Sequence, residues 1–182
     1  MQFIETSLPG VIKVIPVAHE DARGFFMETW QSQRFHDVGI DAQFVQENVS
    51  RSSRGTLRGL HYQIQQPQGK LVRVASGQVF DVAVDLRKSS ATFGQWAGET
   101  LSAENRLGLW VPPGFAHGFL VLSETALFEY KCTDFYAPEF ERSIRWDDPD
   151  IGIEWPLPAG EQPVLSDKDA SAPLLKDAET YA

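Results

Sequence analysis

The chain has 182 residues, a net charge of −9, one cysteine, and a composition that is 42% hydrophobic and 23% charged. At roughly 100–200 residues per domain, this length predicts one domain over residues 1–182. The composition is globular, the acidic charge argues against nucleic acid as a partner, and no apolar run reaches the roughly 20 residues of a membrane span. A single cysteine, Cys132, excludes an internal disulfide and a CxxC zinc site. With no visible secretory signal, the sequence predicts a cytoplasmic protein.

Helical periodicity is scarce along the chain. Residues 32–38 are expected to form a short helix, and residues 172–181 another, with Pro173 in its first turn. Elsewhere, short apolar runs alternate with Gly, Pro and Ser residues that are typical of turns. The expected strands are residues 70–75, 78–86, 110–111, 119–122 and 126–132. Many short strands with few helices predict an all-β sandwich or barrel.

Positive charge is concentrated in one stretch of this acidic chain. No Asp or Glu lies between Glu47 and Asp81, and the bases of that stretch are Arg51, Arg54, Arg58, Lys70 and Arg73. A basic block within an acidic protein favours a cationic pocket, with a solvated basic face as the alternative.

Two of the four histidines lie beside glycines. His61 lies in RGLHYQ (58–63) and His117 in PPGFAHG (112–118). Glycine next to histidine permits a close backbone approach, which a ligand pocket often requires. The Pro-x-Gly-x-x-His spacing resembles the second motif of the cupin superfamily, a double-stranded jelly roll. Metal-binding cupins carry HxH and a Glu where this chain has His61-Tyr62-Gln63, so we expect a cupin pocket without a metal.

Longer motifs extend the resemblance to about residues 1–176. They are DARGFFME (21–28), QENVS (46–50), GTLRGLHYQ (55–63), GKLVR (69–73), FDVAVDLR (80–87), WVPPGFAHGF (110–119), YK (130–131), WDDP (146–149), IGIEWP (151–156) and LSDKD (165–169). In this order they are similar to the dTDP-4-dehydrorhamnose 3,5-epimerase family. The resemblance implies an all-β, cupin-type double-stranded jelly-roll barrel with a few short peripheral helices. It also implies a dTDP-4-keto-6-deoxyhexose substrate, no cofactor, no metal and a homodimer.

The chemistry of that family sets three requirements. Carbons 3 and 5 of the sugar adjoin the C4 ketone, so epimerisation needs a base on one face, stabilisation of the enolate oxygen and an acid on the other face. The resemblance implies His61 as the base, Lys70 as the group at the C4 oxygen and Tyr130 as the acid. An imidazole of ordinary pKa, near 6.5, is largely neutral at pH 7 and able to accept a proton. Asp169 is the implied partner of His61, with Asp167 as the rival in the same segment.

The resemblance also implies the contacts of the substrate. Guanidinium groups suit bidentate phosphate recognition, and amides suit a nucleobase. The implied binding residues are Arg23, Glu28, Gln46, Glu47, Asn48, Arg58, Lys70, His117, Glu141 and Lys168. In the family, Arg23 and Glu28 serve a pocket completed across a dimer. The chain departs from some relatives at Phe135, where they have a tyrosine.

Three other functions fit parts of the pattern. The first is a related cupin that epimerises C3 alone or isomerises a 3,4-keto group; retention of His61 and Tyr130 favours two carbons instead. The second is a metal-dependent cupin oxygenase, against which the missing HxH and Glu count. The third is a non-catalytic sugar-nucleotide-binding module, against which the retained His61 and Asp169 count.

Overall fold

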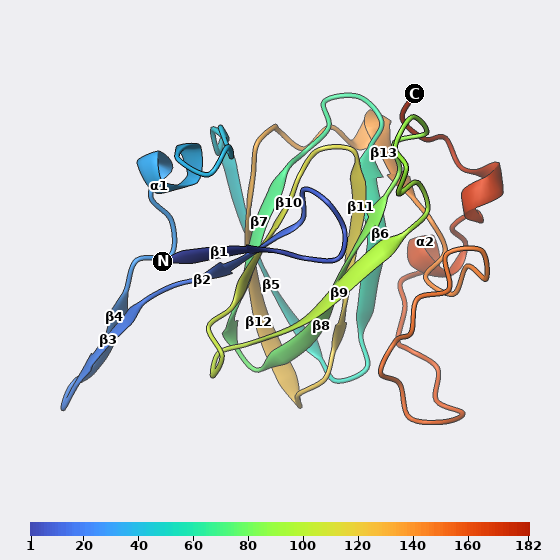
Figure 1. Ribbon diagram of the computed structural model, residues 1–182. Helices are drawn as coiled ribbons and strands as arrows, with labels where there is room; N and C mark the ends of the chain where they lie inside the picture. Colours follow the sequence, from blue (N-terminus) through green and yellow to red (C-terminus); the bar gives the residue numbers. More distant parts are fainter.

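Two antiparallel sheets face each other in the computed structural model, which describes residues 1–182 (Figure 1). One sheet has six strands in the order β1-β2-β10-β7-β12-β5, and the other has five in the order β13-β6-β11-β8-β9. A third, two-stranded sheet, β3-β4, projects from the barrel (Figure 1). The predicted all-β, cupin-type jelly roll is confirmed.

Strands dominate the chain, and its helices are short. The strands are β1 (Gln2–Glu5), β2 (Ile12–Ile15), β3 (Ala18–Asp21), β4 (Gly24–Met27), β5 (Gln46–Ser53), β6 (Leu57–Gln63), β7 (Lys70–Ser76), β8 (Gln78–Asp85), β9 (Trp96–Ser102), β10 (Gly108–Val111), β11 (Phe115–Val121), β12 (Thr125–Cys132) and β13 (Glu141–Ser143). The helices are α1 (Ser32–His36) and α2 (Asp167–Ala170), with the 3-10 turns η1 (Pro138–Phe140) and η2 (Leu175–Asp177). The five expected strands therefore correspond to β7, β8, β10, β11 and β12, and the first expected helix to α1. None of the helices has the length and apolar character needed to cross a bilayer.

The main core fills the space between the two large sheets. It contains 15 buried hydrophobic residues, among them Val72 of β7, Phe128 of β12 and Phe119 of β11. The rings of Phe119 and Phe128 stack with centroids 4.1 Å apart. Side chains alternate along a strand, so the faces that bury Val72 and Phe128 also direct Lys70 and Tyr130 between the sheets. At the end of the barrel that holds Lys70 and Tyr130, the core changes from apolar to polar.

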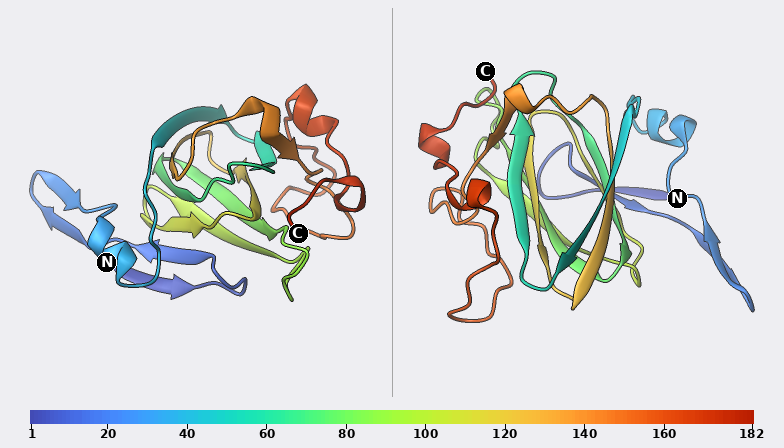
Figure 2. Two further views of the ribbon diagram at one scale, coloured as in Figure 1. Left: turned by 90° about the horizontal axis from the view of Figure 1, so that it is seen from above. Right: turned by 180° about the vertical axis from the view of Figure 1, so that it is seen from behind.

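The five-stranded sheet is covered on its outer face as well. Val82 and Val84 of β8 pack there in a second cluster of eight buried residues. The C-terminal segment lies beside this sheet (Figure 2). Tyr181 packs on the cluster, with its ring 5.9 Å from that of Tyr62. Both faces of β8 are therefore buried, and burying each large apolar side chain contributes about 1.5–3 kcal/mol.

The expected helix at residues 172–181 is wrong. Only the single turn η2 (Leu175–Asp177) is helical there, and other backbone groups of the segment bond to remote parts of the chain. The Leu175 N–H donates to a carboxylate oxygen of Asp148 at 2.6 Å. The Tyr181 N–H donates to the Leu86 carbonyl, and the Tyr181 carbonyl accepts from Lys88 N–H. Packing of the tail on the barrel outweighs a helix propensity of a few tenths of a kcal/mol, roughly, per residue.

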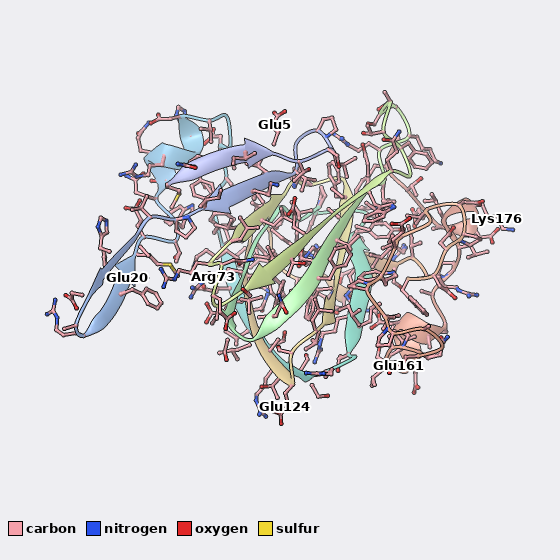
Figure 3. The ribbon with its side chains drawn as sticks, turned by 60° about the horizontal axis from the view of Figure 1, so that its bottom comes forward. Glu5, Glu20, Arg73, Glu124, Glu161 and Lys176 are labelled. Carbon is pink, nitrogen blue, oxygen red and sulfur yellow. The ribbon has the colours of Figure 1, made fainter.

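Beyond its base, the β3-β4 hairpin contacts the rest of the chain through Arg106. Its rings are exposed, 53% for Phe25 and 73% for Phe26. Arg106 pairs with Glu20 at 2.6 Å and lies over the Phe25 ring at 4.4 Å. Figure 3 shows Glu20 on this arm, outside the barrel. The hairpin thus exposes aromatic surface that the rest of its own chain does not cover.

Candidate active site

A cavity of about 260 Å³ lies where the start of β5, the end of β6, the start of β7 and the end of β12 meet. Strand register brings its residues together, because Tyr130 lies opposite Asn48 and Cys132 lies opposite Lys70. The residues that line it are Gln46, Asn48, His61, Tyr62, Gln63, Gln68, Lys70, Tyr130, Tyr136 and Glu141. The structure therefore places His61, Lys70 and Tyr130 around one space.

His61 forms a hydrogen-bonded pair with Asp169. Its Nε2 lies 2.6 Å from Oδ1 of Asp169, whose side chain is only 4% exposed. The Ser166 hydroxyl caps α2 by accepting from the Asp169 N–H, which fixes the carboxylate. Burial alone would raise the pKa of Asp169, but the hydrogen bond and charge of His61 hold that pKa below its usual value. The rival Asp167 is exposed and makes no contact with His61.

Glycines bring β6 and β11 close together beside this pair. His61 lies opposite His117 in the register of the two strands. A Cβ on Gly59 would lie 2.5 Å from the Gly118 Cα, and one on Gly118 would lie 2.7 Å from the Arg58 carbonyl oxygen. The close backbone approach that these glycines permit therefore occurs between β6 and β11.

A second histidine–aspartate pair lies deeper in the barrel. The Asp81 side chain is completely buried, and both of its oxygens lie 2.9 Å from Nε2 of His117. Phe128 stacks beside the His117 ring with centroids 6.1 Å apart. Burial raises the pKa of Asp81, while His117 and Lys70 act against that rise. The carboxylate orients His117 and adds negative charge near Lys70.

Lys70 and Tyr130 come from neighbouring strands of the six-stranded sheet. Burial lowers the pKa of Lys70, and the acidic groups Cys132, Glu141 and Asp81 nearby oppose this shift. Burial also raises the pKa of Tyr130, so its phenol stays protonated at neutral pH. A protonated phenol therefore faces the histidine strand from the opposite sheet.

Glu141 and Lys168 form an ion pair at the rim of the cavity, 2.5 Å apart. The Tyr136 hydroxyl donates to the other Glu141 oxygen at 2.9 Å. Burial works toward a higher pKa of Glu141, but the bonds from Lys168 and Tyr136 bring its pKa below the ordinary value. Two binding residues implied by the resemblance thus meet each other directly.

Arg58 lies in a neighbouring hollow of about 420 Å³ that shares His61 with the cavity. Lys168, Ser166 and Asp169 also line this hollow. Arg58 is exposed, and its Nε donates to the Ser52 hydroxyl at 3.0 Å. Arg58 and Lys168 therefore place two cations in the hollow that His61 also lines.

The three residues of β5 differ in their placement. Gln46 donates to the Asn48 side-chain oxygen at 3.1 Å, and both residues line the cavity. Glu47 points to the outer face of the sheet, where it pairs with Lys131 at 2.8 Å. The side chain of Glu47 is thus not brought to the cavity, although its backbone runs beside it.

Arg23 and Glu28 are also not brought to the cavity of their own chain. Arg23 belongs to the turn of the projecting hairpin, has a side chain 90% exposed, and pairs with Asp21. Glu28 follows the hairpin and pairs with Arg34 at 2.9 Å. The views of the hairpin from two further sides agree that it extends away from the barrel (Figure 2).

Sequence reasoning missed two residues of the site. Asp81 lies in the mostly apolar run of β8. An acidic residue inside such a run was the sequence signal that could have pointed to it. Tyr136 follows Phe135 in the loop after β12 and lines the cavity, whereas no periodicity marks that loop.

Proton transfer is the chemistry for which these groups are arranged, so the fold and the site together define an acid–base enzyme of the cupin type. Its sequence matches the family described as dTDP-4-dehydrorhamnose 3,5-epimerase over residues 5–177, and the chain belongs to that family.

Relatives and solved structures agree with this placement. The chain is 54% identical to the dTDP-4-dehydrorhamnose 3,5-epimerase of Pseudomonas aeruginosa, over 100% of this chain and 99% of the relative. It is similar to the crystal structure of a dTDP-6-deoxy-D-glucose-3,5-epimerase from Legionella pneumophila in complex with dTDP-4-keto-L-rhamnose. The TM-score of this match is 0.94, and the identity is 54% over 98% of this chain and 94% of the Legionella chain. The chain is also similar to the crystal structure of ChmJ, a 3′-monoepimerase from Streptomyces bikiniensis, in complex with dTDP-quinovose. The TM-score is 0.88, and the identity is 38% over 94% of this chain and 86% of ChmJ.

Proposed function

We propose that this cavity epimerises dTDP-4-dehydro-6-deoxy-D-glucose at C3 and C5 to give dTDP-4-dehydro-L-rhamnose. The protein is an isomerase of the dTDP-4-dehydrorhamnose 3,5-epimerase family, and this reaction belongs to dTDP-L-rhamnose biosynthesis. Each epimerisation removes one proton from carbon and returns one to the opposite face. Because no electrons are gained or lost overall, the reaction does not call for a redox cofactor.

His61 acts as the base in this proposal. Its Nε2 is engaged by Asp169, which leaves Nδ1 to accept the proton from the carbon next to the ketone. The Asp169 carboxylate then stabilises the imidazolium that forms. The single observation that carries the proposal is this pair, whose His61 lies on one sheet across the cavity from Tyr130 on the other.

Lys70 stabilises the negative charge that develops on the C4 oxygen. An ammonium buried in a cavity interacts with an enolate more strongly than one in water, because the local dielectric is low. His117 lies on the same barrel-facing side and is held in place by Asp81. His117 is not among the residues that line the cavity, so its contact with the sugar stays a prediction.

Tyr130 returns the proton on the opposite face. Its pKa is raised by burial, so the phenol keeps its proton until an enolate forms beside it. The phenolate then regains a proton from solvent while His61 releases one. The enzyme returns to its starting state with both carbons treated in turn.

The nucleotide half of the substrate fits the cationic hollow beside His61. Arg58 and Lys168 line that hollow and suit the diphosphate, while Gln46 and Asn48 offer amides to the base or the sugar. We also propose that two copies associate, so that Arg23 and Glu28 of one hairpin reach the cavity of the other. Exposed Phe25 and Phe26 support this, since large exposed apolar groups mark interaction surfaces.

We further propose that residues 1–182 act as one domain and work in the cytoplasm. The only cysteine, Cys132, is a free thiol buried in the barrel, which fits a reducing compartment.

Proton NMR of dTDP-4-keto-6-deoxyglucose incubated with the protein in D2O and EDTA tests the function. Deuterium at both C3 and C5 is the expected result. Deuterium at C3 alone would instead make the chain a monoepimerase, as ChmJ is described. No exchange at either carbon would overturn the proposal.

A further inference from the structure

Three glutamine side chains hold the loop that follows β12. This loop, residues 134–137, is called the aromatic loop here because it carries Phe135 and Tyr136, which are 62% and 53% exposed. The glutamines come from three places: Gln46 from β5, Gln63 from the end of β6 and Gln68 from the β6–β7 connection. The aromatic loop is thus tied to a strand of each large sheet, β5 in one and β6 in the other.

Every residue of the aromatic loop has one backbone group bound by a glutamine. Gln68 Nε2 donates to the Asp134 carbonyl at 2.9 Å. Gln63 Nε2 donates to the Phe135 carbonyl at 3.2 Å, and Gln63 Oε1 accepts from the Ala137 N–H at 2.9 Å. Gln46 Oε1 accepts from the Tyr136 N–H at 2.8 Å. Side chains supply the pairing that a strand would otherwise give this segment.

Gln63 is the centre of this arrangement. It is 3% exposed, and its Nε2 also donates to the Gln66 carbonyl at 2.8 Å. Both amide hydrogens and the amide oxygen are therefore bonded within the protein, so this side chain is engaged by the fold. Its own carbonyl accepts from the Tyr181 hydroxyl at 2.5 Å, which ties the C-terminal segment to the same point.

The aromatic loop determines where Tyr136 stands. Tyr136 lines the cavity and donates to Glu141, which pairs with Lys168 at the rim. Gln63 follows His61 by two residues on β6, so one strand carries both the base and the anchor of the aromatic loop. Movement of the anchor would displace Tyr136 relative to His61.

We infer that Gln63 is a positioning residue for nucleotide-sugar binding, which fixes the aromatic loop so that Tyr136 completes the cavity wall beside His61. The inference deepens the proposed function and rests on it for the identity of the ligand. Gln46 and Gln68 support the same loop with one bond each.

Hydrogen exchange on the ligand-free protein tests the tether itself. Gln63→Met removes three hydrogen bonds while keeping most of the side-chain volume, and it should speed exchange of the Tyr136 and Ala137 amides. Gln68→Met removes one bond at a less buried position and should give a smaller change in the same direction. Ser123→Ala is the control, because it breaks half-buried bonds to Gln78 and Thr125 at the opposite end of β12. Unchanged exchange in both glutamine variants would overturn the inference.

A double-mutant cycle tests the effect on binding. Gln63→Met should weaken binding of dTDP, measured by calorimetry, and raise KM by about tenfold, equivalent to 1.4 kcal/mol. It should lower kcat much less, because the base and acid remain. If Gln63 acts through Tyr136, its effect should largely disappear in a Tyr136→Ala background. An undiminished effect there, or the same loss in Ser123→Ala, would contradict the positioning role.

Failure of the proposed function would look different. In that case the wild-type protein would neither bind dTDP nor exchange deuterium into the sugar. The exchange rates of the aromatic loop would still decide whether Gln63 tethers it, and unaltered rates would reject the inference on their own.

Discussion

At the scale of single residues, the His61–Asp169 pair makes a sharp test because the same short helix carries a matched control. Asp169 is buried against His61, whereas Asp167 is exposed. Asp169→Asn removes the charge that stabilises the imidazolium and places an amide donor near the ring. We expect kcat to fall by about 10²–10⁴, as for loss of general-base assistance. Asp167→Asn should leave kcat unchanged in the same NMR assay. Equal losses in the two variants would remove Asp169 from the mechanism.

Asp81 predicts a change in pH dependence. Lys70 is faced by the acidic groups Cys132, Glu141 and Asp81 and by the basic Lys168, while burial lowers its pKa. Asp81→Asn deletes a negative charge that favours the ammonium, so the pKa of Lys70 should fall further. The alkaline limb of the kcat profile should therefore move to lower pH.

Glu129→Gln is the control for that profile. Glu129 pairs with Arg73 on the outer face of the six-stranded sheet, away from Lys70. Its loss should leave the alkaline limb in place. A shift of the limb in both variants, or in neither, would show that Asp81 does not set the charge state of Lys70.

At the scale of elements, a strand could be predicted from the sequence when its own residues show an apolar pattern. β8 was predicted because Val82 and Val84 alternate with other residues in an apolar run. β5 has no such pattern, because its inner positions carry Gln46 and Asn48 for the cavity in place of apolar residues. Its strand geometry comes from pairing with β12, which is remote in sequence. Polar residues placed at inner positions for a cavity therefore weaken the pattern of the strand that carries them.

The same contrast applies to the site residues. His61, Lys70, Tyr130 and Asp169 were identified from motifs and lie together as expected. The positions of Arg23 and Glu28 could not be predicted from motif spacing, because no contact fixes the projecting hairpin to the cavity of its own chain. Packing between distant segments, which periodicity does not record, accounts for both the missed aromatic loop and the wrong C-terminal helix.

The connection after β8 gives a stability prediction for a whole element. Asp85 is fully buried and accepts from Arg87, Ser90 and Thr92, which close this turn. Burial opposes ionisation, but these bonds hold the pKa of Asp85 well below its usual range. Asp85→Asn should lower the free energy of unfolding by about 2–3 kcal/mol at neutral pH, the scale of a hydrogen-bonded buried charge.

The sign of its pH dependence follows from linkage. A carboxyl with a lower pKa in the folded state stabilises above the unfolded pKa, near 3.9, and that contribution is lost as pH falls toward the folded value. The difference between wild type and Asp85→Asn in urea unfolding should therefore shrink in acid. A difference that stays constant from neutral pH into acid would contradict an ionised Asp85 in the folded protein.

At the scale of the whole molecule, the hairpin and the barrel hold apart two residues that we propose serve one site. Arg23 lies at the exposed turn of the hairpin, while His61 lies in the barrel. If the cavity is completed by a second copy, the two residues of a working site come from different chains. A closed two-fold dimer would contain two such sites, each sharing residues between copies.

Mixing two inactive variants tests this arrangement. Arg23→Ala and His61→Ala homodimers should each have low activity. In a mixed dimer, the barrel of the Arg23→Ala chain meets the intact hairpin of the His61→Ala chain, which restores one complete site. After subunit exchange at equal concentrations, half the dimers are mixed with one working site each, so about a quarter of wild-type activity should return. Sedimentation of each variant checks that it remains a dimer. If activity does not rise above that of Arg23→Ala alone although exchange is complete, Arg23 does not serve the partner's cavity.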